Sequence, residues 1–218
     1  MKVEKKRKNK IFVNFFYDFA VATGAVPGLI WLRPKRIYEN PAAKKHIQGG
    51  ALIVSNHASL IDPIYLMFVL WYRRQRFVCM SELTKSPVSS LFFKLARCIP
   101  IDRDNMNFDS FREIVEILKN DELVSIFPEG HVNEGENDIN QFKSGAVLMS
   151  VMSGKPIIPI YIAKPKHFFS GLKAVIGEAI DPLAIYGRRP RGKELDELSE
   201  LLRQRELNLM KIYEENLK

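Results

Sequence analysis

The segment "ALIVSNHASLIDPIYLMFVLWY", residues 51–72, contains the most regular pattern in the sequence. Its first five residues, 51–55, follow a "GG" turn and are almost all apolar, which predicts a buried strand. Asp62 and Pro63 then open a second apolar segment. Proline suits the first turn of a helix, so this segment is predicted to be helical. The stretch is therefore one strand, one polar turn and one helix.

The same alternation of strands and helices continues to the end of the chain. Further strands are predicted over 76–81, 98–102, 123–127, 156–163 and 173–180. Further helices are predicted from Pro87, from Ser110, over 142–154 and from Lys193, with Ser110 and Glu113 as a capping box. Several of these strands are apolar throughout. The predicted fold is α/β, with a central, mostly parallel or mixed sheet covered by helices.

The N-terminus differs in composition from the rest of the chain. Six Lys/Arg and one Glu among residues 1–10 account for +5 of the formal net charge of +8 over 218 residues. Residues 11–32 are mostly apolar but contain Asn14 and Asp18, which are costly inside a bilayer. The sequence favours two short helices around "GAVPG" that lie in the membrane interface. A signal peptide, a helix packed on the domain and a solvated basic tail are the alternatives.

Three strand ends carry polar residues, and sites in α/β sheets lie at the carboxyl ends of strands. After the strand at 51–55 come His57 and, five residues later, Asp62. An imidazole can accept a proton from a hydroxyl near pH 7, and does so better when a carboxylate holds its other nitrogen. The alternative is a structural loop histidine, with Asp62 as a helix N-cap.

Four further residues are candidates for binding a polar or anionic ligand. Arg103 follows the strand at 98–102 and suits a phosphate, or else forms a surface ion pair. Glu129 and Gly130 form part of the turn "FPEG" after the strand at 123–127. Lys143 is predicted at the start of a helix, where backbone amides also attract anions.

Four blocks in this order give the chain a resemblance to the glycerolipid acyltransferase family. The blocks are "NHASLID" (56–62), "IPIDR" (99–103), "IFPEG" (126–130) and "PIIPI" (156–160). The resemblance covers about residues 50–165. Together with the composition of the N-terminus, it leads us to expect a basic, amphipathic membrane-binding segment over residues 1–35 and an acyltransferase domain over residues 36–218.

The resemblance implies transfer of an acyl group from a thioester of coenzyme A or acyl carrier protein to a hydroxyl of lysophosphatidic acid, forming phosphatidic acid. It implies that His57 is the base and Asp62 its partner, that Arg103 binds the acceptor phosphate, and that Glu129 and Gly130 line the acceptor site. Pro159 would shape the acyl-binding region. The expected location is the cytoplasmic face of a membrane, as a peripheral or monotopic protein.

One departure from the family pattern concerns the acceptor. The family's third block usually continues with Thr and Arg, whereas here His131, Val132 and Asn133 follow Gly130. Lys143 or a protonated His131 would have to replace the missing arginine. The alternatives are therefore a different lysophospholipid, a glycerol acceptor, or an inactive membrane-binding relative.

The remaining motifs favour direct attack on the thioester. The sequence has no G-x-S-x-G element and no cysteine in the blocks, so we expect no covalent acyl-enzyme. We expect no metal, because there is no His/Cys cluster, and no bound cofactor beyond the thioester co-substrate. Cys79 and Cys98 are expected to be reduced thiols. Basic and acidic side chains are nearly balanced in residues 11–218, which also argues against a nucleic-acid partner.

Overall fold

The computed structural model describes residues 2–102, 108–133, 139–163 and 171–217. Its centre is a seven-stranded sheet in the order β1-β7-β6-β2-β5-β3-β4. Neighbouring strands run parallel except β6 and β7, which are antiparallel. The strands are β1 (Lys35–Tyr38), β2 (Ala51–Ser55), β3 (Gln75–Met80), β4 (Cys98–Ile101), β5 (Leu123–Ile126), β6 (Ile157–Ile162) and β7 (Lys173–Ile176). The predicted α/β fold with a mostly parallel sheet is confirmed.

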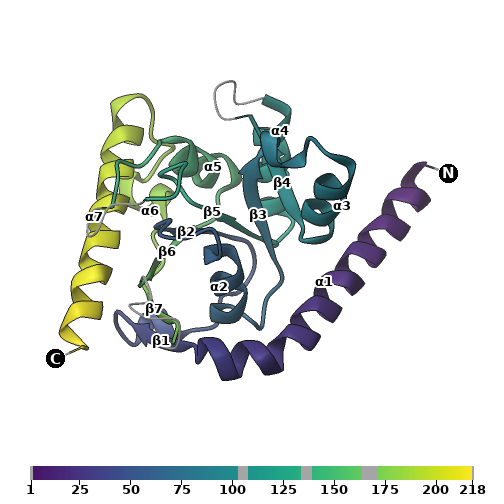
Figure 1. Cartoon of the computed structure of the whole chain (residues 1–218). Coiled ribbons are helices and arrows are strands. Elements are labelled where there is room, and N and C mark those ends of the chain that lie inside the picture. Colours follow the sequence, from purple (N-terminus) through teal and green to yellow (C-terminus); the bar gives the residue numbers. More distant parts are fainter. Residues whose placement is uncertain (1, 103–107, 134–138, 164–170, 218) are drawn as a thin grey trace.

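Helices cover both faces of this sheet, and the long N-terminal helix lies along one side of the molecule (Figure 1). The α-helices are α1 (Lys2–Leu32), α2 (Asp62–Val69), α3 (Pro87–Leu95), α4 (Phe108–Lys119), α5 (Gly145–Ser153), α6 (Pro182–Tyr186) and α7 (Lys193–Glu215). Two 3-10 turns, η1 (Ala42–Lys44) and η2 (Ser81–Thr84), complete the described elements.

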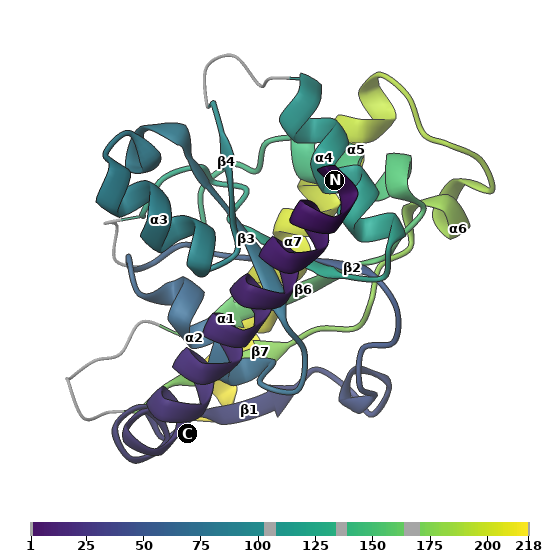
Figure 2. The same ribbon diagram turned by 90° about the vertical axis from the view of Figure 1, so that its right-hand side faces the viewer.

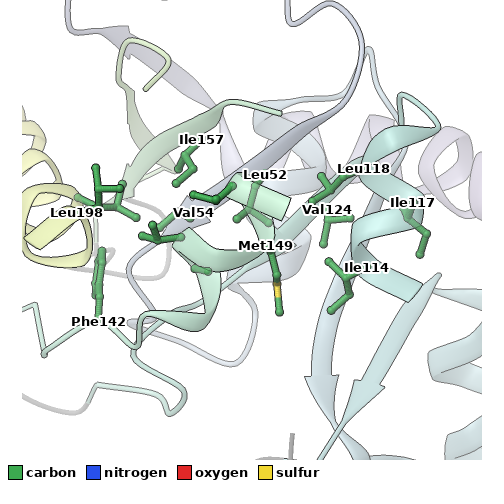
Figure 3. Close-up of a cluster of buried hydrophobic side chains, with 14 of the residues drawn as sticks. Leu52, Val54, Ile114, Ile117, Leu118, Val124, Phe142, Met149, Ile157 and Leu198 are labelled. Atoms are coloured by element: carbon green, nitrogen blue, oxygen red, sulfur yellow. The ribbon is translucent and has the colours of Figure 1, made fainter. Parts of the chain in front are cut away.

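The core forms two layers because both faces of β2 are buried. Leu52 and Val54 point to one layer, with side chains from α4, α5 and α7 (Figure 3). Ala51 and Ile53 belong to the other layer, with side chains from α2. This explains why β2 is apolar at every position except its last, as expected for a parallel strand with both faces covered.

One local prediction differs from the structure, and two short elements were not predicted. Helix α4 begins at Phe108, so Ser110 lies inside it, and the predicted capping box is wrong. The Ser110 hydroxyl instead donates to the backbone oxygen of Pro100, at 3.3 Å. Strand β1 and helix α6 were not predicted, because both are short and β1 carries two basic residues.

The N-terminal segment is one helix, α1, with Pro27 inside it, so the predicted pair of short helices is wrong. Figure 1 shows α1 changing direction towards its C-terminal end, as expected near a proline. Gly28 lets α1 approach α2 closely here, because a Cβ at this position would lie 2.1 Å from the ring of Phe68 and would displace that ring.

The two polar residues of the apolar segment face the body of the protein. Asn14 Oδ1 accepts a hydrogen bond from Arg97, at 2.8 Å. Asp18 accepts two from Arg74, at 2.7 and 2.6 Å, and this pairing lowers the pKa of Asp18. Tyr17, between them, is buried. Polar contacts therefore attach α1 to the domain.

The outward face of α1 is apolar. Its large side chains are 57–67% exposed, and most of them lie four or seven residues apart: Ile11, Phe12, Phe15, Phe19, Val26 and Ile30. A helix of a soluble domain usually turns such a stripe inward. In the described part of the chain, no helix is both long and apolar enough to span a membrane.

Candidate active site

His57 and Asp62 form a direct side-chain pair in the turn between β2 and α2. His57 Nδ1 lies 2.9 Å from Asp62 Oδ2. The Asp62 side chain is 1% exposed and that of His57 is 16% exposed. The carboxylate is therefore enclosed, while the imidazole still reaches the surface. The structure thus brings these two predicted site residues together.

The hydrogen bonds of Asp62 indicate which ring nitrogen of His57 carries the hydrogen. Asp62 is the first residue of α2, and the N-cap is Ile61, so the predicted capping role is wrong. Asp62 Oδ2 also accepts the backbone N–H groups of Ala58 and Ser59, each at 2.8 Å. This oxygen acts as an acceptor, so Nδ1 carries the hydrogen, and Nε2 keeps a lone pair that can accept a proton.

A stacked aromatic ring also holds the imidazole of His57. The ring of Phe127 stacks on it, with centroids 4.2 Å apart and planes 18° from parallel. Phe127 lies directly after β5, so two neighbouring strands position one imidazole. On the other side of β2, the Asn56 side chain bonds to the backbone N and O of Ile162 in β6, at 2.8 and 3.0 Å.

Glu129 is buried, and both of its carboxylate oxygens are occupied by the protein. Oε1 accepts the backbone N–H of His57, at 2.9 Å. Oε2 accepts from the Asn133 side chain at 3.2 Å and from the Asn140 backbone N–H at 3.1 Å. The Asn133 backbone N–H also donates to the His57 carbonyl, at 2.6 Å. Glu129 and Asn133 therefore bind the backbone N–H and the carbonyl of His57, and we call this arrangement the Glu129 clasp.

The other predicted ligand residues are placed differently. Gly130 closes the turn by donating to the Phe127 carbonyl, at 3.0 Å, and its φ of +75° is one that favours glycine. Lys143 is exposed and lies one residue before Ser144, the N-cap of α5. Its backbone N–H donates to the Pro128 carbonyl, at 3.2 Å, which holds it close to the same turn. Arg103 lies outside the described residues.

The first and third blocks meet at the carboxyl ends of the parallel strands, which we call the carboxyl edge of the sheet. Strands β2 and β5 are parallel neighbours, so the turns that follow them lie side by side. Strand β4, which leads towards Arg103, is parallel to β3 and ends at this same edge. Asn56, Phe127, Asn133 and Asn140 were not predicted as part of the site. Asn56 and Phe127 lie within the first and third blocks, so the sequence contained a signal for these two.

A fully buried carboxyl group lies behind this edge. Glu206 of α7 accepts the backbone N–H of Ile160 in β6, at 3.1 Å, and is 0% exposed. Burial raises the pKa of Glu206 well above its ordinary value, and the negative charge of Glu129 raises it further. Glu206 therefore keeps its proton to a higher pH than an exposed glutamate does.

One cavity lies away from this chemistry. It has a volume of about 760 Å³ and is lined by Asp18, Arg74, Arg97 and Glu122, among others, at the amino ends of the strands. It lies between α1 and the rest of the domain, and the ion pair between Asp18 and Arg74 forms part of its wall. Among the residues that the structure describes, no three His, Cys, Asp or Glu side chains gather into a metal-binding cluster.

Comparison with known proteins agrees with this geometry. A family model described as "Acyltransferase" matches residues 35–163, which is more than half of the chain. The chain belongs to the acyltransferase family. The matched residues contain the His57–Asp62 pair, the Glu129 clasp and every strand of the sheet except β7.

Members of the acyltransferase family with similar sequences come from several bacteria. The 1-acyl-sn-glycerol-3-phosphate acyltransferase of Bacillus subtilis is 28% identical over 72% of this chain and 79% of its own length. That of Streptococcus pneumoniae is 25% identical over 70% of this chain and 56% of its own length. The crystal structure of the 1-acyl-sn-glycerophosphate acyltransferase PlsC from Thermotoga maritima has a TM-score of 0.57. At 21% identity, covering 94% of this chain and 82% of that one, it shows the same fold.

Proposed function

We propose that this protein transfers a fatty acyl group from a coenzyme A or acyl carrier protein thioester to the free hydroxyl of lysophosphatidic acid, forming phosphatidic acid. The observation that carries the proposal is the His57–Asp62 pair, because its Nδ1 is held by a carboxylate while its Nε2 can accept a proton. The names of the similar bacterial proteins support this acceptor.

The reaction needs no covalent enzyme intermediate. His57 Nε2 takes the proton of the acceptor hydroxyl as the oxygen attacks the thioester carbonyl carbon. The tetrahedral intermediate collapses, the C–S bond breaks, and the thiolate leaves with the proton returned by His57. Asp62 stabilises the imidazolium that exists between these steps, as the carboxylate of a catalytic triad does. Base catalysis of this kind contributes about 10²–10⁴-fold to the rate.

A second acceptor class is favoured by one feature of the site. Val132 stands where the family usually has an arginine, so a cationic ligand for a bare phosphate is missing at that position. Lys143, or His131 when it is protonated, could replace it, and both are exposed beside the same turn. A lysophospholipid with a larger head group is therefore the alternative, and one similar plant protein is named lysophospholipid acyltransferase LPEAT1.

We also propose that residues 1–35 bind the cytoplasmic face of a membrane. The exposed apolar stripe of α1 suits insertion into the lipid interface. The six Lys/Arg of residues 1–10 suit anionic head groups. Asn14 and Asp18 do not oppose this placement, because they face the domain and not the lipid.

The test is acyl transfer by the His57→Ala variant. With labelled acyl-CoA or acyl-carrier-protein donors and lysophosphatidate, we expect its kcat to fall by about 10²–10⁴-fold while its circular dichroism is unchanged. His46→Ala is the matched control, since this exposed histidine only stacks on Tyr72, with ring centroids 4.3 Å apart. Transfer by His57→Ala at the parent rate would exclude the mechanism.

A screen of acceptors distinguishes the two acceptor classes. The parent protein is offered lysophosphatidate, lysophospholipids with larger head groups, and glycerol 3-phosphate. The highest kcat/KM for lysophosphatidate would support the first proposal. The highest value for a larger head group would replace it with the second.

A further inference from the structure

Exposed apolar side chains lie in the segments that follow β2 and β3, two of the strands whose carboxyl ends lie near His57. They are 44–83% exposed, and we call them the apolar rim: Leu60, Ile64, Leu83, Val88, Leu91 and Phe92. Single exposed apolar residues are ordinary, but a group of this size usually marks an interaction site.

Helix α3 contributes half of the rim and is unusual in burying none of its residues. Val88, Leu91 and Phe92 follow the i, i+3, i+4 spacing of one helical stripe. The helix is locally well specified, because Pro87 occupies its first turn and the Ser86 hydroxyl accepts the N–H of Ser89, at 3.1 Å. A well-capped helix whose stripe faces outward requires a partner for that stripe.

The rim lies at the site because of the sheet topology. Strands β2, β5 and β3 are consecutive and parallel, so the segment after β3 begins at the same edge as His57. Leu83 lies in η2, directly after β3, and Val88 is the second residue of α3. Leu60 follows His57 by three residues. Helix α3 also contacts α1, and Figures 1 and 2 both show the two helices side by side.

We propose that the apolar rim is a second membrane-docking surface, separate from α1, that seats the mouth of the active site on the bilayer. The occupant is a lipid surface, because the exposed lysines Lys85 and Lys94 flank the stripe of α3 and that helix contains no acidic residue. The inference rests on the proposed function, in which acceptor and product are lipids. Docked this way, the acceptor hydroxyl reaches His57 while its acyl chain stays in the leaflet.

The test compares two triple variants of the full-length protein. V88Q/L91Q/F92Q removes the stripe of α3, whereas I185Q/L201Q/L217Q removes exposed apolar residues of α6, α7 and the C-terminus. Helix α7 lies on the opposite side of the molecule from α1 and α3 (Figure 1). Because all six side chains are exposed, both variants should fold with the parent's circular dichroism and melting temperature.

The first measurement is flotation with vesicles of phosphatidylethanolamine and phosphatidylglycerol. We expect the α3 variant to bind roughly tenfold or more weakly than the parent, and the control variant to bind like the parent. Parent-like binding by the α3 variant, or an equal loss in the control, would overturn the proposal. The proposal would also be overturned if the parent protein were a dimer without lipid and the α3 variant were a monomer that binds vesicles like the parent.

The second measurement separates this proposal from the proposed function. The α3 variant should lose most transfer to lysophosphatidate presented in vesicles but keep the parent kcat with a hexanoyl analogue that is monomeric in water. Equal losses with both acceptors would overturn the docking role. A parent that acylates neither acceptor would contradict the proposed function, while flotation, which needs no turnover, would still decide on the rim.

Discussion

At the scale of single residues, the site depends on which nitrogen of His57 carries the hydrogen. An Asp62→Asn variant keeps the size of the side chain, but its amide can place an N–H against Nδ1 and so move the hydrogen to Nε2. Nε2 could then no longer accept a proton from the acceptor. We expect kcat to fall by about 10²–10⁴-fold with little change in KM, measured by steady-state transfer. An unchanged kcat would show that Asp62 is only structural.

Glu129 gives a prediction that distinguishes positioning from acceptor binding. In Glu129→Gln, one oxygen becomes an amide that cannot accept from both Asn133 and Asn140. Loss of such a bond costs about 1 kcal/mol, so the clasp predicts a kcat roughly fivefold to tenfold lower with acceptor KM unchanged. A raised acceptor KM with unchanged kcat would instead indicate direct contact with the acceptor. Asn133→Ala should reproduce the kcat loss, whereas Asn120→Ala, at the exposed end of α4, should not.

The sequence was most informative about residues close together in the chain. The five-residue spacing from His57 to Asp62 was enough to predict their contact, because a short turn into a helix brings them together. The clasp on His57 joins Glu129 to Asn140, eleven residues along the chain, and no local sequence pattern predicts that contact. The sequence therefore identified Glu129 through its block, while its hydrogen-bond partners emerged only from the three-dimensional structure.

At the scale of elements, the contact between α7 and β6 should make stability depend on pH. The pKa of Glu206 is raised, so the folded state holds a proton that the unfolded state releases. Stability is therefore fully present below the ordinary carboxyl value of 4.5 and falls as pH rises towards the folded value. Glu206→Gln removes this titration and keeps an acceptor for the Ile160 N–H.

Melting temperatures of the parent and Glu206→Gln, measured from acid to mildly alkaline pH, check this prediction. The two should agree most closely at acid pH, and the variant should become the more stable as pH rises. Glu129 and Tyr161, which also interact with Glu206, are unchanged in both proteins, so the difference isolates residue 206. A difference that does not vary with pH would mean that Glu206 is ionised in the folded protein.

The elements themselves were predictable where burial imposes a pattern. β2 and α5 follow from apolar runs ended by polar or glycine residues, and both lie close to where the sequence places them. β1 was missed because "KRIY" has no apolar run, and its stability comes from pairing with β7, far along the chain. α1 was divided at Pro27 in the prediction, whereas contact with α2 supports a single bent helix.

At the scale of the whole molecule, α1 and the apolar rim offer two separate surfaces to one membrane. The α1 stripe can be tested by F12S/F15S/F19S, since these side chains are 57–66% exposed. We expect weaker flotation with anionic vesicles, unchanged melting temperature and unchanged kcat with the monomeric hexanoyl acceptor, because the stripe does not touch the site. The I185Q/L201Q/L217Q variant again serves as the control.

Combining the α1 and α3 variants tests whether both surfaces engage the same bilayer. Two surfaces on one rigid body bind a membrane more tightly together than either does alone, since the second docks at high effective concentration. The sextuple variant should therefore lose flotation almost completely, while each triple variant keeps a measurable fraction. If the α3 substitutions cause no further loss in the α1 background, α1 alone holds the protein on the membrane. His57 would then have to receive its lipid from a site that faces water.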